Sequence, residues 1–342
     1  MPKVSILIPL YNRRHYIEQC LDSALNQTFQ DYDIIIRDDG STDGSADFVA
    51  EKYAAAIAAG KIKLLRNEKN IGEFPTDNRL LREATGKYIM ILHSDDMYLP
   101  QALEHMCAVA EHFNADVVHA SRLFYSPPGG VIEEGTPLQL VCWESNPVDE
   151  ITLMPDDKTF RFNEFMTNGT FADAPHCIFR REFLTENGIS FDGIITFLFW
   201  LMEAKVFVKV PQPFYIYRNS PDSITNENFP PERVTKFIGD QIKLSRVLDE
   251  YFAEDEFFKD NEEFRYMVKS HLLQGGHWHW MERNAVYRNG ITPELHRAVA
   301  EGFKKYFGDD AAFPTFLFHY VHAVLAGQRP DTIPPPTALI AA

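Results

Sequence analysis

The chain has 342 residues, of which 45% are hydrophobic and 24% are charged, as in a folded protein with a sizeable core. Its formal net charge of −16 argues against general binding to nucleic acid or to anionic membranes, because phosphate groups are bound mainly through Lys and Arg. A nucleotide is not excluded, since it needs only a local site.

The first half of the chain alternates between two kinds of segment. Five apolar segments have the composition of buried strands: residues 4–9, 32–37, 61–66, 88–92 and 115–120. Four segments between them have helical spacing or helix-forming composition: residues 17–25, 46–59, 77–84 and 100–113. Strict alternation predicts right-handed crossovers and a mostly parallel sheet with flanking helices. In such a sheet, ligands bind beyond the carboxyl ends of the strands.

The strand at 88–92 ends in a cluster of polar side chains, His93, Ser94, Asp95 and Asp96. Two carboxylates at a strand end suit a divalent cation. The alternative is that both acids only cap the helix that begins near Pro100. The strand at 32–37 also ends in acids, Asp38 and Asp39.

The pattern is lost between residues 124 and 157. Beyond this region, residues 176–180 and 206–210 are strand-like and residues 195–204 form a predicted helix. After Pro230 the character becomes helical, with three further predicted helices at residues 232–251, 262–288 and 293–307. The last residues contain three consecutive prolines, Pro334 to Pro336, and are predicted to form an extended tail.

Targeting and cysteine signals are weak. The chain begins with a strand-like segment rather than a charged leader, and no apolar run reaches the ~18 residues of a membrane span. The four cysteines, Cys20, Cys107, Cys142 and Cys177, have no metal-type or redox-type spacing and are interpreted as reduced core residues. These observations favour a cytoplasmic protein, with peripheral contact at the inner face of a membrane left open.

Four stretches together resemble a known family. They are VSILIPLYNRRHYIEQCLDSALNQTF, RDDGSTDGS, NIGEFPTDNRLLREATGKYIMILHSDD and YIYRNSPDSIT, and in this order they are similar to the family 2 glycosyltransferases of the GT-A fold. The resemblance implies a Rossmann-like α/β domain over residues 1–225, with a nucleotide-binding half (1–122) and an acceptor half (123–225). A helical C-terminal region (226–327) and a Pro-rich tail (328–342) would follow.

The resemblance implies a role for several residues. Tyr11, after Pro9, matches the position that stacks on the donor base, and Asp39 matches the acid that hydrogen-bonds it; Asp38 has a comparable chance of being structural. Asp95 matches the last acid of the Asp-x-Asp motif, which holds Mn2+ or Mg2+, whereas Asp96 more often supports the loop or meets the acceptor. The residues expected to bind the donor and its cation are Pro9, Tyr11, Asp39, Arg79, His93, Ser94 and Asp95.

Two departures from the family concern the donor site. His93 replaces the first acid of the Asp-x-Asp motif, so we expect a modified site in which His93 donates a hydrogen bond or acts as a ligand. Asp77 stands where the family has a basic residue before Asn78, and Arg79 could replace that residue on the diphosphate.

A third departure concerns the catalytic base. Residues 194–200 contain no acid where the family has the carboxylate that deprotonates the acceptor. Asp192, just before the predicted helix, is the first candidate for this role. Other candidates remain, and they are Asp173, His176 and Glu203.

Aromatic residues and two histidines cluster near residue 280. His277 and His279 are two residues apart, so on a helix they point in nearly opposite directions and are favoured as packing residues. Trp278, Trp280 and Tyr287 are interpreted mainly as core, with a sugar-binding face as the alternative.

The sequence therefore predicts a metal-dependent, inverting glycosyltransferase, a hexosyl- or related transferase. It would move a sugar from a nucleotide-diphosphate donor, first a UDP- or dTDP-sugar, to a hydroxyl of a glycan or glycolipid. The predicted C-terminal helices could contact the acceptor, a membrane or a second subunit. The alternatives are a degenerate member that binds a nucleotide sugar or glycan without transfer, and a sugar nucleotidyltransferase. The second is weakened because Pro9 to Asn12 is not the Gly-rich loop that such enzymes use.

Overall fold

The computed structural model describes residues 1–125, 140–143, 148–168, 174–191, 194–219, 247–261 and 264–265. The chain divides into two units, Met1–Glu227 and Asn228–Ala342, and the site described below lies in the first. The predicted boundary at residue 225 falls outside the described residues, and so does the tail. The assignment of donor half, acceptor half and helical region stays a prediction.

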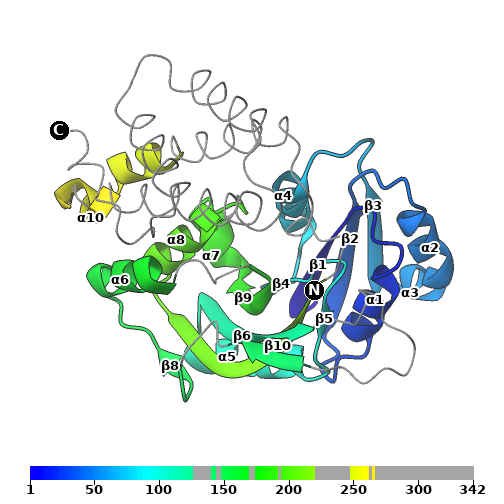
Figure 1. Ribbon diagram of the computed structural model, residues 1–342, viewed down its shortest axis with the longest axis horizontal. Helices are drawn as coiled ribbons and strands as arrows, with labels where there is room; N and C mark the ends of the chain where they lie inside the picture. Colours follow the sequence, from blue (N-terminus) through cyan, green and yellow to red (C-terminus); the bar gives the residue numbers. More distant parts are fainter. Residues whose placement is uncertain are drawn as a thin grey trace, which may run out of the picture. The chain divides into compact units, whose positions relative to one another are not determined.

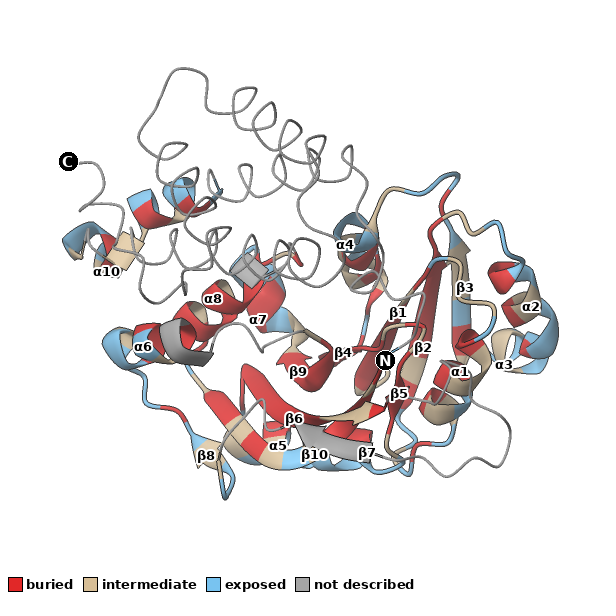
Figure 2. Cartoon of the chain, viewed as in Figure 1, coloured by how far each residue is buried: buried red, intermediate tan, exposed pale blue. Residues whose placement is uncertain are grey.

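A parallel sheet forms the first half of unit one. Its strands run in the order β3-β2-β1-β4, and each neighbouring pair is parallel. Apolar side chains point from both faces of the central strands into the core, as expected of parallel sheets. Figure 2 shows β1, β2 and β4 as mostly buried, whereas the edge strand β3 is largely exposed or intermediate. The strands are β1 (Val4–Leu10), β2 (Tyr32–Asp38), β3 (Ile62–Arg66) and β4 (Tyr88–Ile91).

Helices connect these strands and cover both faces of the sheet. In Figure 1, α1 to α3 lie on one side of the β1–β2–β3 strands and α4 on the other. The inner face of α1 follows helical spacing, with Ile17, Cys20, Leu21 and Ala24 buried. The helices are α1 (Ile17–Leu25), α2 (Ser45–Lys52), α3 (Ala54–Ala58), α4 (Glu73–Glu83) and α5 (Ala102–Phe113).

The second half of the sheet mixes strand directions. Strand β9 (Cys177–Arg180) lies antiparallel between β4 and β6 (Val117–Tyr125), and β6 pairs in parallel with β10 (Phe207–Arg218). Both β6 and β10 are long and curved in Figure 1. Three short strands pair antiparallel to them: β5 (Met97–Tyr98), β7 (Leu140–Trp143) and β8 (Thr152–Leu153). The remaining helices of this half are α6 (Lys158–Asn168), the 3-10 turn η3 (Ala174–His176), α7 (Arg181–Glu186) and α8 (Ile194–Glu203).

The predicted α/β fold with a parallel core is confirmed, but several boundaries were wrong. The predicted helix 46–59 is two helices, α2 and α3, which separate at Tyr53, whose hydroxyl is held by Asp22 at 2.8 Å. Helix α4 begins at Glu73 rather than Asp77, directly after Gly72 with φ 99°. Strand β10 continues through Pro211 and Pro213 because its register shifts there, which is how sheets accommodate proline.

The described part of unit two is helical. Residues 247–254 are helical, which agrees with the end of the predicted helix 232–251, and α10 (Glu256–Asp260) follows. Leu248, Phe252 and Phe258 are buried, and the last two rings are 4.5 Å apart. The other predicted helices and the residues around His277 and His279 lie outside the described residues. Among the described residues, no helix is long and apolar enough to cross a membrane.

Candidate donor site

The carboxyl ends of three parallel strands meet at one edge of the sheet. The last residue of β1, Leu10, pairs with Asp38 of β2, and the Asp39 amide donates to the Leu10 carbonyl at 2.7 Å. The Leu92 amide, just beyond β4, donates to the Leu7 carbonyl of β1 at 2.9 Å. Tyr11, Asp39 and His93 therefore follow neighbouring strands at a single edge, as the sequence predicts.

The loop after β1 is held in place while its aromatic ring stays accessible. Asn12 has φ 50°, and its amide donates to Ser41 Oγ at 2.9 Å, while its own Oδ1 accepts from the Thr42 amide at 2.8 Å. These bonds fasten the loop to the segment that follows β2. Tyr11 is 43% exposed, so its ring is available to a planar ligand. Pro9 lies within β1, opposite Arg37 of β2.

Asp39 is buried and organises the loop before α4. Its carboxylate accepts from the Asn67 side chain at 2.8 Å and from the Ile71 and Gly72 amides at 2.9 Å each. The side chain is therefore part of the fold as well as a predicted ligand for the base. Asp38 has a local role, because it accepts from the Ser41 amide at 3.2 Å and closes its own turn.

Arg79 belongs to the same cluster as Asp39. Its guanidinium donates to Asn67 Oδ1 at 2.8 Å, and Arg37 donates to the same oxygen at 3.3 Å. Arg79 is exposed, so it borders the site with a positive charge. Its predicted contact with a diphosphate stays a prediction.

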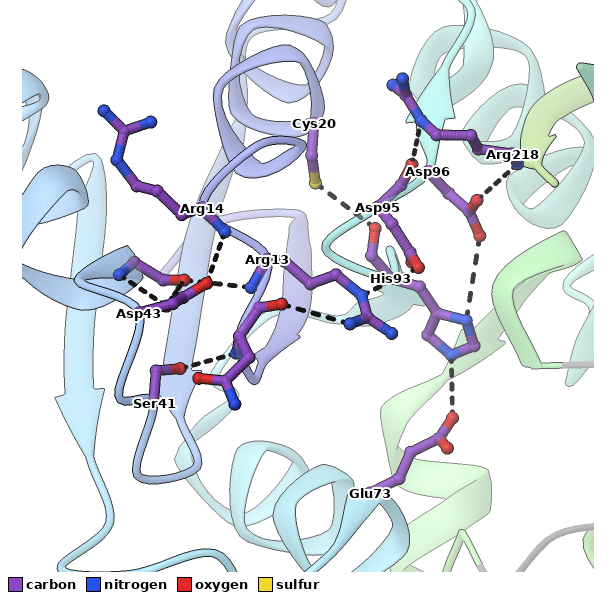
Figure 3. Close-up of polar contacts among 12 residues, drawn as sticks. Arg13, Arg14, Cys20, Ser41, Asp43, Glu73, His93, Asp95, Asp96 and Arg218 are labelled. Atoms are coloured by element: carbon purple, nitrogen blue, oxygen red, sulfur yellow. Dashed lines mark hydrogen bonds and ion pairs between the residues drawn. The ribbon is translucent and has the colours of Figure 1, made fainter. Parts of the chain in front are cut away.

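The Asp95 carboxylate lies opposite this loop and is paired with Arg13. Arg13 Nε donates to Asp95 Oδ2 at 3.0 Å, and the two side chains are 17% and 18% exposed. Figure 3 shows the Arg13 side chain reaching from the Ser41–Asp43 region to Asp95. This ion pair joins the loop that carries Tyr11 to the loop that carries the predicted cation ligand.

Asp96, in contrast, is buried, and two residues of β10 donate hydrogen bonds to its carboxylate. It accepts hydrogen bonds from the Tyr215 hydroxyl and, at 2.7 Å, from the Arg218 amide. Burial, followed by the charge on Asp95, raises the pKa of Asp96 to about 7.

Helix α5 has Gln101 at its N-cap without a side-chain cap bond, so the alternative in which these acids cap the helix is wrong. The neighbouring Ser94 is also buried.

His93 lies among acids and is positively charged at neutral pH. Its Nε2 is 3.5 Å from Glu73 Oε1 and its Nδ1 is 3.9 Å from Asp96 Oδ2. Burial lowers its pKa, but the surrounding acids, Glu73 first, outweigh burial and raise the pKa to about 9. Asp77 is one of these acids, and burial together with Glu73 raises the pKa of Asp77 well above its usual range. A protonated imidazole donates hydrogen bonds and does not bind a cation. The donor role predicted for His93 is therefore favoured over the ligand role.

The residues present fit a cation that arrives with a diphosphate. No group of three His, Cys, Asp or Glu side chains among the described residues is placed to hold a metal. Mg2+ and Mn2+ commonly take one or two protein carboxylates and complete their shells with phosphate oxygens and water. Asp95 can supply one such carboxylate once Arg13 leaves it.

The catalytic base stays unassigned. Asp192 and Asp173 lie outside the described residues. Glu203 is in the last turn of α8, 3.8 Å from Lys158. His176 is buried, 5.2 Å from the Tyr215 ring between centroids, and burial followed by Arg122 lowers its pKa well below the usual value. His176 is linked to the acidic loop through Tyr215, which donates to Asp96, although its lowered pKa makes it a weak base.

Several residues of the site were missed by the sequence reasoning. Arg13, Glu73 and Asn67 contact Asp95, His93 and Asp39 respectively, and Arg218 donates from Nε to the Asp95 carbonyl at 2.6 Å. Arg13 had a usable signal, since it directly follows Asn12 in the loop after β1. The others are brought in by tertiary packing.

Comparison with known proteins agrees with this geometry. Residues 5–188 match the family described as Glycosyl transferase family 2. Glycosyltransferase GlyG of Streptococcus pneumoniae is 28% identical over 231 residues, which cover 66% of this chain and 74% of that protein. The poly(ribitol-phosphate) beta-glucosyltransferase of Bacillus spizizenii is 27% identical over 261 residues. The aligned region covers 72% of this chain and 37% of that protein.

Solved structures show the same fold. The crystal structure of S. aureus TarS 1-349 in complex with UDP-GlcNAc has a TM-score of 0.62 and 18% identity, covering 89% of this chain and 81% of that one. The mannosyltransferase PcManGT from Pyrobaculum calidifontis, in complex with GDP-Man and Mn2+, has a TM-score of 0.50 and 16% identity, covering 96% and 81%. The family match spans more than half of the sequence. The chain is therefore a glycosyltransferase that belongs to glycosyl transferase family 2.

Proposed function

We propose that this protein transfers a sugar from a UDP- or dTDP-linked donor to a hydroxyl of a glycan or glycolipid acceptor. The observation that carries the proposal is the meeting of Tyr11, Asp39 and Asp95 at one edge of the parallel strands. The exposed ring suits a stacked base, the buried carboxylate suits its N–H group, and Asp95 suits a cation on the diphosphate.

The hydrogen-bonding capacity of Asp39 supports a pyrimidine base. A carboxylate offers about four acceptor positions, and three protein N–H groups, from Asn67, Ile71 and Gly72, already occupy Asp39. Counting only partners from the described residues, one position remains. Uracil and thymine each present a single imide N–H, whereas guanine presents donors on two adjacent nitrogens. The complex of TarS with UDP-GlcNAc points the same way.

The proposed reaction requires the protein mainly to position donor and acceptor and to stabilise the charge on the departing diphosphate. Mn2+ or Mg2+ held by Asp95 would neutralise charge on the departing nucleoside diphosphate. His93 and Arg79 add positive charge beside the site, and Asp192 is our proposed base for in-line displacement with inversion. PcManGT in complex with GDP-Man and Mn2+ supports a metal-dependent donor site. A cytoplasmic location, and membrane or subunit contact through the predicted C-terminal helices, stay predictions.

Nucleotide binding measured by calorimetry tests the donor site. UDP, dTDP, GDP and ADP would each be titrated with and without Mn2+ into wild type, Asp95→Asn and the control Glu111→Gln. Glu111 lies on α5, and its side chain pairs with Lys3. We expect UDP or dTDP to bind best, with a metal-dependent gain that Asp95→Asn loses and Glu111→Gln keeps. If none of these nucleotides binds, the proposed donor site is wrong.

Release of UDP from a panel of UDP-sugars, measured by mass spectrometry, tests catalysis. Slow hydrolysis or transfer that Asp192→Asn abolishes would support the assigned base. Binding without any release or transfer in the presence of candidate glycan acceptors would indicate a protein that holds the donor without transferring it.

A further inference from the structure

The Arg13–Asp95 ion pair joins the two ends of the proposed donor site. Arg13 comes from the loop after β1, two residues beyond Tyr11, and Asp95 comes from the loop after β4. Nε of Arg13 donates to Oδ2 of Asp95 at 3.0 Å. Arg13 thus neutralises the carboxylate on which the proposed cation depends.

The main chain of Arg13 is fixed by hydrogen bonds, whereas its guanidinium is only partly engaged. The Arg13 amide donates to Ser45 Oγ at 3.0 Å, and Asn12 before it is bonded to Ser41 and Thr42. The guanidinium donates one further bond, to the Asn12 carbonyl at 3.2 Å. Within the described part of the chain, these contacts engage two of its five N–H donors. The others can meet an anion without any movement of the backbone.

Asp95 and Asp96 differ in burial and in how firmly their carboxylates are held. Asp96 is buried and held by the Tyr215 hydroxyl and the Arg218 amide. Asp95 is partly exposed, and its carboxylate contacts Arg13. Its main chain is still anchored, because Arg218 Nε donates to its carbonyl. The carboxylate is therefore presented on a fixed loop and paired with a cation from the opposite loop.

We propose that Arg13 takes the place of the divalent cation on Asp95 in the donor-free protein and releases the carboxylate when metal and nucleotide bind. This inference rests on the proposed function. A divalent cation and a guanidinium repel each other on one carboxylate. A diphosphate, in turn, offers Arg13 a new bidentate acceptor. Arg13 therefore makes metal and nucleotide bind with positive coupling, and each raises the affinity of the other by the same factor.

Manganese binding without nucleotide separates this role from catalysis. Free Mn2+ would be measured by electron paramagnetic resonance in wild type and in Arg13→Gln. We expect Arg13→Gln to bind Mn2+ roughly tenfold more tightly, because a competing charge-assisted hydrogen bond is gone. Arg13→Lys keeps the charge but not the planar fork, so we expect a smaller gain.

Arg14 provides a matched control. It is the next residue and carries the same charge, but its guanidinium lies over the Phe48 ring, 3.4 Å from the ring centroid. Arg14→Gln should leave Mn2+ affinity unchanged, which would exclude a general effect of net charge. The double variant Arg13→Gln with Asp95→Asn should lose the gain, which would place the extra Mn2+ at Asp95.

Repeating the titrations with UDP measures the coupling. UDP should raise Mn2+ affinity by a larger factor in wild type than in Arg13→Gln. Equal or weaker Mn2+ binding by Arg13→Gln without UDP, or an equal gain in Arg14→Gln, overturns the inference while the donor site stands. Absence of Mn2+ binding by wild type with UDP overturns the metal-dependent donor site and this inference together.

Discussion

The Tyr215 hydroxyl donates a hydrogen bond to the buried Asp96 carboxylate, although 119 residues separate the two in the chain. Tyr215 lies in β10, and the same strand supplies the Arg218 amide to Asp96 and the Arg218 guanidinium to the Asp95 carbonyl. The acidic loop after β4 is therefore held by the last strand of the sheet. Asp96 is thereby buried and hydrogen-bonded, whereas the Asp95 side chain stays partly exposed.

Replacing Tyr215 by Phe should destabilise the protein by about 1–3 kcal/mol, because a buried carboxylate loses a donor. The loss should be larger above pH 7 than at pH 5, since the pKa of Asp96 is raised to about 7 and only its ionised form needs the donor fully. Urea unfolding at both pH values measures this. Tyr217→Phe, in the same strand but half-buried, is the control. Equal losses at both pH values would contradict this account of Asp96.

His93 should make stability fall as the pH rises. Its pKa is about 9 in the folded protein against 6.5 for the free side chain, so the folded state holds the proton more tightly. The resulting stabilisation is complete below pH 6.5 and is lost between pH 6.5 and 9. We expect the free energy of unfolding to drop by on the order of 1–3 kcal/mol over this window.

The histidine contribution can be isolated with His93→Gln. Urea unfolding at pH 6, 7.5 and 9 should show a flatter dependence on pH in this variant than in wild type. His15→Gln, at an exposed histidine in the loop after β1, should keep the wild-type slope. An unchanged slope in His93→Gln would show that other groups dominate the titration.

We expect Asp39 both to stabilise the fold and to bind the donor. Replacing it by Asn places an NH2 group against the amides of Ile71 and Gly72, and we expect a loss of about 1–3 kcal/mol. Hydrogen exchange should show reduced protection at these two amides while the β1 amides keep theirs. Unchanged protection at Ile71 and Gly72 would mean that the loop does not depend on Asp39.

Much of the fold follows from the sequence because buried parallel strands are continuous apolar runs, and β1, β2 and β4 were placed within one residue or two. Strand β5 has two residues, too few to give any period. Helix α6 (Lys158–Asn168), which directly follows the region without a clear pattern, was not predicted. The prolines in β10 suggested a strand end, but the strand continues there with a shift in register.

The residues of the site likewise fall into some that the sequence predicts and others that only the structure identifies. Tyr11, Asp39 and Asp95 follow strand ends, so chain order alone brought them to one edge. Their partners come from packing between distant segments, as with Arg13 on Asp95 and Tyr215 on Asp96. The raised pKa of His93 is also a property of the fold, since Glu73 reaches it from α4. A sequence motif identifies the residue that faces the ligand. The residues that hold it in place come from distant parts of the chain, so only the tertiary structure identifies them.

A substitution at Tyr11 should weaken donor binding without changing stability, whereas a substitution at Asp39 should affect both. Tyr11 is 43% exposed, so Tyr11→Ala should change the free energy of unfolding by no more than about 0.5 kcal/mol. Stacking of a base on an aromatic ring contributes about 1–3 kcal/mol, so affinity for UDP should fall by about 5-fold to 150-fold. Calorimetric titration of UDP with Mn2+ measures this, and Tyr11→Phe should retain wild-type affinity. If Tyr11→Ala binds UDP as tightly as wild type, the base does not stack on this ring, and the donor must lie elsewhere along the strand ends.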